Sequence, residues 1–455
     1  MKRAAVLLVV VLLCAACIPG VKAGRRCSTS EWGDDGVYAL KCENGRWVRK
    51  ATKAQVAQLL IALAKSRQTT TTTTTVPAAP TTTVDPNPSG TATAVGVGDG
   101  SSCALIADGR VKCWGQDRYG QLGDGTVFQP VSSTSAQPVV GVTTATALAV
   151  GLQHACAVLA GGSVTCWGSD TAGQMADGTL ASPDENPTPH VVAGVTGAVS
   201  IAAGSAHTCA LLANATVQCW GADSTGQIGD GTVGSPAFSA PNVVPGLTNV
   251  IAIAAGGGST CAIVTGGAVK CWGSDDHGEL GDGTNGTPTT NPSPVAVVGI
   301  TNAIALGARG DVTCAALQTG AVKCWGNDEV GGIGDGTIAN PLVNPSPVDV
   351  IGVAGASRIT VGDAVCALVA GGIVKCWGYD GDGELGDGTV GPNSGTPATV
   401  ATISSATAVT AGTQSTCAVV AGAVWCWGSN DRGQLGNGHV GSPNAQPTPA
   451  AVLGI

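Results

Sequence analysis

The chain has 455 residues, with 69 Gly, 24 Pro and 18 Cys, and its 21 basic and 30 acidic residues give a net charge of −9. This length allows two or three domains or one long repetitive domain. Charged residues make up only 11% and hydrophobic residues an ordinary 44%, which argues against disorder of the main body. The acidic balance argues against a nucleic-acid-binding protein, which needs a basic face. Abundant glycine favours short strands and turns over helices.

Residues 1–23 predict a signal peptide. Met1-Lys2-Arg3 is followed by the apolar run 4–16 and by small residues before position 24. The run is too short to span a bilayer as a helix. The alternative is a lipoprotein cleaved before Cys17, although Cys14 occupies the position where an aliphatic residue is usual. We therefore expect a secreted or cell-surface protein, with lipid anchoring at Cys17 left open.

The cysteines of the exported chain predict disulfides. Zinc is less favoured because the cysteines are spread evenly rather than gathered in close ligand sets. One pair lies near the mature N-terminus and seven recur along the rest of the chain: Cys27 with Cys42, Cys103 with Cys113, Cys156 with Cys166, Cys209 with Cys219, Cys261 with Cys271, Cys314 with Cys324, Cys366 with Cys376, and Cys417 with Cys426.

Three regions follow the signal peptide. Residues 24–66 form a small basic module with a hairpin turn predicted at 43–46 and a short helix predicted over 53–65. Residues 67–91 are a Thr/Pro-rich linker, and residues 92–455 are a repeat array carrying nine basic and 25 acidic residues. The basic module could contact an anionic surface, fold back on the acidic array, or simply be solvated.

The array repeats seven times with a period of 51 to 53 residues, which indicates a propeller, a solenoid or a row of independent units. Each unit contains Cys-Trp-Gly, and the clearest copies of a second motif read Gly-Gln-Leu-Gly-Asp-Gly-Thr, as at 120–126. Short β runs separated by turn residues predict three or four strands per unit and no helix. This matches the blade of a seven-bladed, all-β propeller.

The cysteine spacing predicts a hairpin in each blade. In six units the paired cysteines flank a three-residue loop such as Ala107-Asp108-Gly109, whose third position is Gly in five units and Ala215 in the other. In the seventh unit a two-residue Ala421-Gly422 turn replaces it. Both registers place the two cysteines directly opposite each other, where a disulfide can form.

The units resemble repeats of the regulator of chromosome condensation (RCC1) family. The segments Gly204-Ser-Ala-His207 and Gly151-Leu-Gln-His154, the Trp-Gly pair and the Gly-Gln-Leu-Gly-Asp-Gly-Thr motif carry this resemblance over residues 92–455. It implies a seven-bladed propeller. Because residues 447–455 match the run that precedes the first strand in other units, we expect one blade to combine both ends of the array.

The resemblance carries function less far than fold. The namesake's exchange activity toward a nuclear GTPase requires an intracellular partner, which a signal peptide contradicts. The family's loop histidine is kept only at His154 and His207. Other residues replace it in the remaining units: Ser101, Ser259, Val312, Ala364 and Ser415. The secreted β-lactamase-inhibitory protein type II shares the fold and blocks an enzyme with one propeller face.

No catalytic group is predicted. The histidines lie in separate blades without a recurring Ser-His-Asp order, and we interpret them as turn residues: His154, His190, His207, His277 and His439. Two acidic series are interpreted as turn formers, with weak calcium binding as the alternative: Asp124, Asp177, Asp230, Asp282, Asp335 and Asp387 with Asn437, and Asp117, Asp170, Asp223, Asp275, Asp328 and Asp380 with Asn430.

The seven Cys-Trp-Gly tryptophans are predicted to pack between blades rather than to line a ligand surface. Binding would then depend on variable stretches, chiefly 127–138, 180–190, 233–245 and 390–398.

The sequence thus predicts an exported, monomeric, non-catalytic scaffold without a cofactor, whose partner is an extracellular or cell-envelope protein. The alternatives are a secreted enzyme inhibitor and a glycan-acting propeller hydrolase or lyase with acids near the central channel.

Overall fold

The computed structural model describes strands in residues 32–34, 38–43 and 46–52 and then residues 90–127, 132–178, 185–234, 238–286, 289–441 and 445–455. The chain divides into two units, Met1–Thr83 and Val84–Ile455. The predicted signal peptide, the predicted helix over 53–65 and nearly all of the linker lie outside the described residues. No helix in the described part is long and apolar enough to cross a membrane.

The first unit contains a three-stranded antiparallel sheet in the order β1-β2-β3. Its strands are β1 (Trp32–Asp34), β2 (Tyr38–Glu43) and β3 (Arg46–Thr52). Glu43 pairs with Arg46, so two residues connect β2 and β3. The two-residue hairpin predicted at this place is therefore confirmed. The disulfide predicted between Cys27 and Cys42 stays a prediction, because Cys42 belongs to β2 but Cys27 lies outside the described residues.

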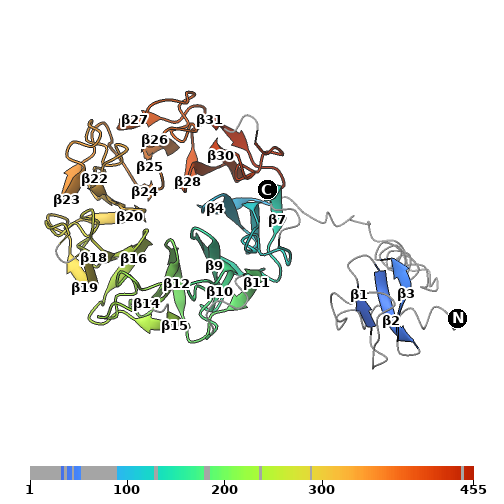
Figure 1. Cartoon of the computed structure of the whole chain (residues 1–455). Helices are drawn as coiled ribbons and strands as arrows, with labels where there is room; N and C mark the ends of the chain where they lie inside the picture. Colours follow the sequence, from blue (N-terminus) through green and yellow to red (C-terminus); the bar gives the residue numbers. More distant parts are fainter. Residues whose placement is uncertain are drawn as a thin grey trace, which may run out of the picture. The chain divides into compact units, whose positions relative to one another are not determined.

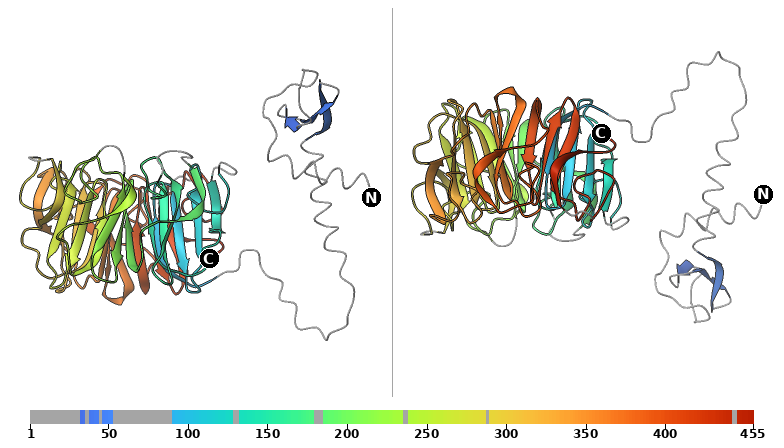
Figure 2. Two further views of the ribbon diagram at one scale, coloured as in Figure 1. Left: turned by 90° about the horizontal axis from the view of Figure 1, so that it is seen from below. Right: turned by 90° about the horizontal axis from the view of Figure 1, so that it is seen from above.

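The second unit is a ring of seven four-stranded antiparallel sheets, as predicted (Figure 1). The first strand of every blade faces the axis, because these strands together line a central cavity of about 200 Å³. The fourth strand lies at the outer edge of each sheet. Figure 2 shows the blades from the side, with turns and loops on two opposite faces.

The strands of the blades follow one another in chain order. Blade one contains β4 (Ala92–Val97), β5 (Ser101–Ile106), β6 (Val111–Gln116) and β7 (Ser132–Pro138); blade two β8 (Ala145–Val150), β9 (His154–Leu159), β10 (Val164–Ser169) and β11 (Glu185–Val191); blade three β12 (Ala198–Ala203), β13 (His207–Leu212), β14 (Val217–Gly221) and β15 (Phe238–Val243); blade four β16 (Val250–Ala255), β17 (Ser259–Val264), β18 (Val269–Ser274) and β19 (Thr290–Ala296). Blade five contains β20 (Ala303–Arg309), β21 (Val312–Leu317), β22 (Val322–Asn327) and β23 (Val343–Asp349); blade six β24 (Arg358–Val361), β25 (Ala364–Val369), the short 3₁₀ turn η2 (Ala370–Gly372), β26 (Ile373–Gly378) and β27 (Ser394–Thr399); blade seven β28 (Ala406–Ala411), β29 (Ser415–Val420), β30 (Ala423–Ser429) and β31 (Ala445–Ala451).

The expected way of closing the ring is wrong. No blade combines both ends of the array, because each of the seven sheets is built from four consecutive strands. The run that we placed before the first strand is the fourth strand of the preceding blade, since it pairs with the third strand of its own repeat, as Gln218 does with Val243. Contacts between blades close the ring instead, such as the Ala92 N–H donating to Gly422 O at 2.8 Å.

The predicted hairpin loops are confirmed. Leu105 pairs with Val111, and Gly109 has φ +86°, in the left-handed region that glycine tolerates. Ala215 adopts φ +61° at the same position, so the backbone conformation is kept without glycine. In blade seven both residues of the two-residue turn have positive φ, as a type I′ turn requires: Ala421 and Gly422.

Each predicted cysteine pair of the array forms a disulfide in the structure, with Cα–Cα distances of 4.0 to 4.1 Å and both cysteines fully buried. The bridges join the second and third strands of their blades: Cys103 with Cys113, Cys156 with Cys166, Cys209 with Cys219, Cys261 with Cys271, Cys314 with Cys324, Cys366 with Cys376, and Cys417 with Cys426.

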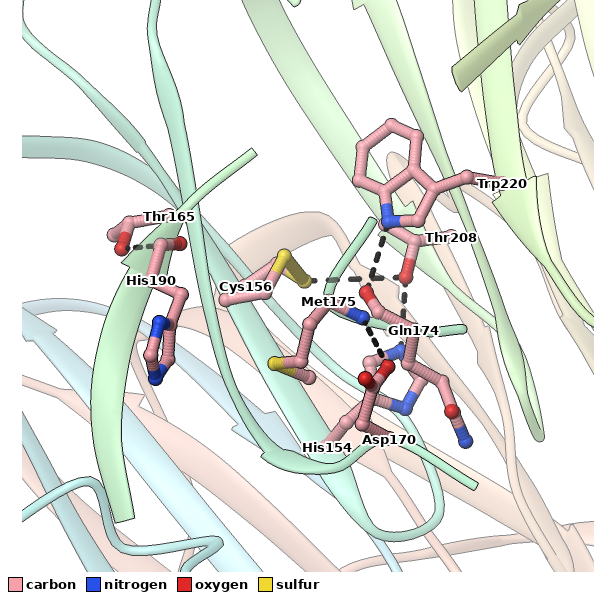
Figure 3. Close-up of a disulfide and its surroundings, with 10 residues drawn as sticks. His154, Cys156, Thr165, Asp170, Gln174, Met175, His190, Thr208 and Trp220 are labelled. Atoms are coloured by element: carbon pink, nitrogen blue, oxygen red, sulfur yellow. Dashed lines mark hydrogen bonds between the residues drawn. A yellow bond between two sulfur atoms is a disulfide. The ribbon is translucent and has the colours of Figure 1, made fainter. Parts of the chain in front are cut away.

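These disulfides reinforce blades that are built from small side chains. Figure 3 shows the Cys156 disulfide of blade two close to Thr208 and Trp220 of blade three. Closing a loop of this length stabilises a fold by about 2–3 kcal/mol in the chain-entropy picture. Such bridges compensate for the limited apolar surface that the Ala and Val side chains of the blades bury.

The seven tryptophans are wholly buried between blades, as predicted. Trp325 of blade five illustrates the contact, because its indole Nε1 donates to the carbonyl of Glu279 in blade four at 2.8 Å. A Cβ on Gly281 would lie 2.7 Å from the same nitrogen, which explains the second Gly of the Gly-x-Leu-Gly motif. Trp114 repeats this bond to Gln434 O and thereby joins blade one to blade seven.

Candidate functional site

One face of the propeller carries the turns between first and second strands and the long loops between third and fourth strands; we call it the loop face. The residue that begins the second strand lies here, and in every blade it pairs with the Gly of Cys-Trp-Gly, as His207 does with Gly221. The side chain of this first residue of the second strand is placed to fill the space toward the next blade. Differences at this position therefore change the packing between neighbouring blades.

His154 and His207 fill that space in blades two and three. The imidazole Nε2 of His154 lies 2.8 Å from Thr208 Oγ1 of the next blade, and that of His207 lies 2.9 Å from Thr260 Oγ1. The Thr260 hydroxyl in turn donates to Gln227 O, so His207 is the donor and its Nε2 carries the proton. Burial lowers the pKa of His154 to about 4 and that of His207 to about 3. Both rings are neutral bridges between blades.

The space between blades five and six is open instead. Val312 and Val365 stand where the His154–Thr208 and His207–Thr260 pairs lie at the junctions of blades two to four, and Gly332 stands where blades one to three carry a Gln side chain. These three residues line a cavity of about 340 Å³. Its volume falls in the range of small-molecule and side-chain pockets. The pocket therefore results from departures of blade five and blade six from the repeat.

The rim of this pocket is mainly acidic. Its carboxylates come from two turns and one loop, namely Asp311, Asp363 and Glu329, while Tyr379 adds a hydroxyl and Arg309 the one guanidinium. Burial raises the pKa of Asp363, and the nearby Arg309 opposes that rise. Burial and neighbouring carboxylates raise the pKa of Tyr379, so its hydroxyl keeps its proton at neutral pH. The walls are apolar and the rim attracts cations.

Arg309 lies between the pocket and the axis of the ring, since it lines both the pocket and the central cavity. Its guanidinium donates to Val97 O at 3.0 Å and to Thr413 Oγ1 at 2.9 Å, in blades one and seven. Burial lowers the pKa of this group, whereas Asp363 and Asp99 favour its charge. Arg309 therefore contributes to holding the channel end of three blades together.

The two acidic series form turns, which supports the simpler of the two interpretations. Asp124 Oδ1 accepts from the backbone N–H and the hydroxyl of Thr126, and the same contacts recur at Asp230, Asp282, Asp335 and Asp387. In the second series Asp117 Oδ1 accepts the N–H of Leu122, five residues on, and this bond recurs along the series.

Two blades place Glu where four others have Gln in the Gly-Gln-Leu-Gly motif. Glu279 and Glu384 are each 1% exposed, and each accepts the backbone N–H two residues earlier, as Gln121 and Gln174 do. Burial raises the pKa of Glu384 to about 8 and also raises that of Glu279. Glu279 belongs to blade four and Glu384 to blade six, the two neighbours of blade five, and neither lines the pocket.

The pocket lies outside the stretches in which the sequence led us to expect binding. The variable stretches that we expected to be binding loops end in strands, namely β7, β11, β15 and β27, and three of them also contain residues outside the described part. Of the remaining histidines, His190 uses its backbone carbonyl to accept from Thr165, and His277 lies beside two carboxylates. A signal for the pocket was present in the sequence, because blade five alone has Gly332 at the Gln position.

Fold and site together define a disulfide-bonded, seven-bladed β-propeller with an acidic pocket on its loop face. Comparison with known proteins matches several segments of the chain to one type of repeat. Residues 92–121, 145–174, 198–227 and 250–279 match one model of the regulator of chromosome condensation (RCC1) repeat, and residues 161–211 and 421–454 match another. The propeller therefore carries repeats of the RCC1 type.

Similar proteins of known name span several classes. The E3 ubiquitin-protein ligase HERC2 of Homo sapiens is 29% identical over 273 residues, which cover 58% of this chain and 6% of HERC2. The ultraviolet-B receptor UVR8 of Arabidopsis thaliana is 27% identical over 290 residues, covering 63% of this chain and 65% of UVR8. In both cases the match spans less than two thirds of the relative.

Solved structures share the fold. Human WBSCR16 superposes with a TM-score of 0.63 at 21% identity, covering 75% of this chain and 94% of that one. Yeast RCC1 (Prp20), in its structure with Kap60, gives a TM-score of 0.61 at 19% identity, covering 70% of this chain and 77% of that one. At these identities the likeness concerns the propeller alone.

Proposed function

We propose that this protein is an exported, non-catalytic, monomeric scaffold that binds an extracellular or cell-envelope protein through the loop face of blades four to six. The N-terminal charged and apolar run supports export, and seven buried disulfides suit an oxidising compartment. The observation that carries the binding proposal is the pocket between blades five and six. It lies where His154 and His207 fill the equivalent space at the junctions of blades two to four.

The chemistry of the pocket selects its occupant. Val312, Val330 and Val365 offer apolar walls, and Asp311, Glu329 and Asp363 offer carboxylates at the rim. A Lys or Arg side chain fits this arrangement, because its aliphatic stem packs on apolar surface while its cationic head pairs with carboxylates. The partner therefore presents a basic residue to this face.

A catalytic role has less support. The acids nearest the channel are engaged, since Asp99 pairs with Arg432 at 2.7 Å and Asp363 Oδ2 accepts the N–H of Gln414. His154 and His207 are closed off by their threonine partners. A general base or nucleophile needs contact with substrate, which the two buried histidines do not offer.

The test is a comparison of captured extracellular proteins by immobilised full-length variants. Glu329→Lys reverses an exposed rim charge, and Ser224→Lys places the same lysine at the equivalent exposed position of blade three. We expect the same protein to be captured by wild type and Ser224→Lys, and at least about tenfold less by Glu329→Lys, the effect of losing roughly 1.4 kcal/mol. Equal capture by all three, or capture of no protein, would contradict the proposal.

A further inference from the structure

His277, Glu279 and Asp311 bring three potential metal ligands together where blade four meets blade five. His277 Nδ1 lies 3.4 Å from Asp311 Oδ2 and 4.0 Å from Glu279 Oε1. All three ligand atoms lie within 4.8 Å of one another. The ligand atoms of a tetrahedral zinc site are roughly 3.3 Å apart, given metal–ligand distances of about 2.0–2.2 Å. The distance between His277 and Asp311 matches that spacing, and the other two distances would have to shorten when an ion binds.

The geometry points to a site for a divalent transition-metal ion on these three residues, with Zn²⁺ as its probe. An imidazole with two carboxylates is a donor set that Zn²⁺ accepts, and a fourth position is left for water. This site is separate from the pocket that carries the proposed function, although Asp311 contributes to both.

The surroundings of each ligand support this assignment. His277 Nδ1 is a buried nitrogen without a hydrogen-bond partner among the described residues, and it faces the two carboxylates. Glu279 is held in place by two donors, the backbone N–H of His277 on Oε2 and the Ser274 hydroxyl on Oε1. Outer hydrogen bonds of this kind orient metal-ligating carboxylates.

Comparison with the other blades shows what is particular to this one. The residue equivalent to His277 in blade three is Thr225, whose hydroxyl donates to Gly258 O in the turn of blade four at 2.9 Å. At the junction of blades seven and one, Arg432 pairs with Asp99. The residue at this loop position thus contacts the next blade in each of these cases. Within the described residues, only blade four has a metal-ligating side chain here together with a buried Glu and an Asp facing it.

The competing explanation is an ion pair between a charged His277 and the two carboxylates, with no metal. The two explanations differ in their response to added Zn²⁺. A bound ion would hold the loop of blade four to the turn of blade five and stabilise the folded chain by mass action. An ion pair would give no saturable response to Zn²⁺.

The experiment is calorimetric titration of Zn²⁺ into the full chain, with thermal unfolding of the same samples. His277→Thr and Glu279→Gln introduce the residues that other blades carry at these positions, so both variants are expected to fold. Asp276→Ser is the matched control, because Asp276 is an exposed acid of the same loop outside the triad. All other histidines and cysteines are shared by every variant.

We expect one Zn²⁺ per wild-type chain at this site and a higher unfolding temperature when it is bound. Both triad variants should bind at least about tenfold more weakly, since even outer-shell partners of a metal contribute that much. Asp276→Ser should behave as wild type. The inference is overturned if wild type shows no saturable binding, or if His277→Thr and Glu279→Gln bind Zn²⁺ as wild type does.

Discussion

Blades two and three differ from blades four to six on the same face of the same ring. In the first region buried, neutral His154 and His207 bridge to a threonine of the next blade. In the second region those positions hold Ser259, Val312 and Ala364, buried acids replace Gln, and a pocket opens. The β strands, disulfides and tryptophans are the same in both. The repeat therefore supplies the scaffold, and departures from it mark the face on which we propose that a partner binds.

The largest loss of stability is expected from removing one of the histidines that bridge to the next blade in blades two and three. His207→Ser introduces the residue that blade four carries, removes a buried ring and leaves Thr260 without its donor. Cavity formation and the lost hydrogen bond should lower the free energy of unfolding by about 3 kcal/mol. Urea unfolding at pH 7 measures the change.

Ser415→Ala is the control for this experiment. Ser415 occupies the equivalent position in blade seven, and its buried hydroxyl has no hydrogen-bond partner among the described residues. Its removal should change stability by less than about 0.5 kcal/mol. A similar loss for the two variants would mean that the histidines are not structural bridges.

A smaller effect is expected from Glu384, and it should depend on pH. Burial raises the pKa of Glu384 to about 8, so the folded chain keeps a proton that the unfolded chain releases above its ordinary value of 4.5. The stability contributed by this proton is present at low pH and is lost as the pH rises from about 4.5 to 8. Glu384→Gln should therefore be more stable than wild type at pH 8, by on the order of 2 kcal/mol, and nearly equal to it at pH 5.

The reverse exchange in blade two sharpens this comparison. Gln174→Glu places a buried acid in blade two, where His154 fills the space toward blade three, and it should create a similar loss of stability above pH 5. Thermal unfolding at pH 5 and pH 8 of wild type and the two variants gives the answer. Comparison at equal pH removes the opposite contributions of His154 and His207, whose lowered pKa values reduce stability as the pH falls below about 6.5. A pH-independent difference for Glu384→Gln would contradict the account.

The repeated features of the fold could be predicted from sequence because the same cysteine spacing, tryptophan and turn residues occur in all seven repeats. The cysteine spacing defined the hairpin register, and the Trp after each second cysteine was predicted to pack between blades, where all seven are buried. The expected closure of the ring was wrong because the strand between two blades follows the third strand of one repeat and precedes the first strand of the next. The sequence pattern alone does not show which of the two blades this strand joins. Only the hydrogen-bonded register, such as Gln218 with Val243, shows which blade it joins.

The candidate site could be predicted only in part. Val312, Gly332 and Val365 are visible departures from the repeat, but their common pocket requires knowing which strands meet between blades. His277 and Glu279 form a local pair, whereas Asp311 comes from the next repeat and reaches them only through the turn after β20. Contacts between repeats are not encoded in any single repeat.

We propose that the partner binds at blades four to six of the loop face. Hydrogen–deuterium exchange of the full chain, alone and with the protein it captures, tests this most directly. The account predicts that the partner slows exchange in the segments 309–312, 329–332 and 362–365, with little change in the equivalent segments of blades two and three. Slowed exchange confined to blades two and three, or to the opposite face around Gly162 and Ala215, would contradict it.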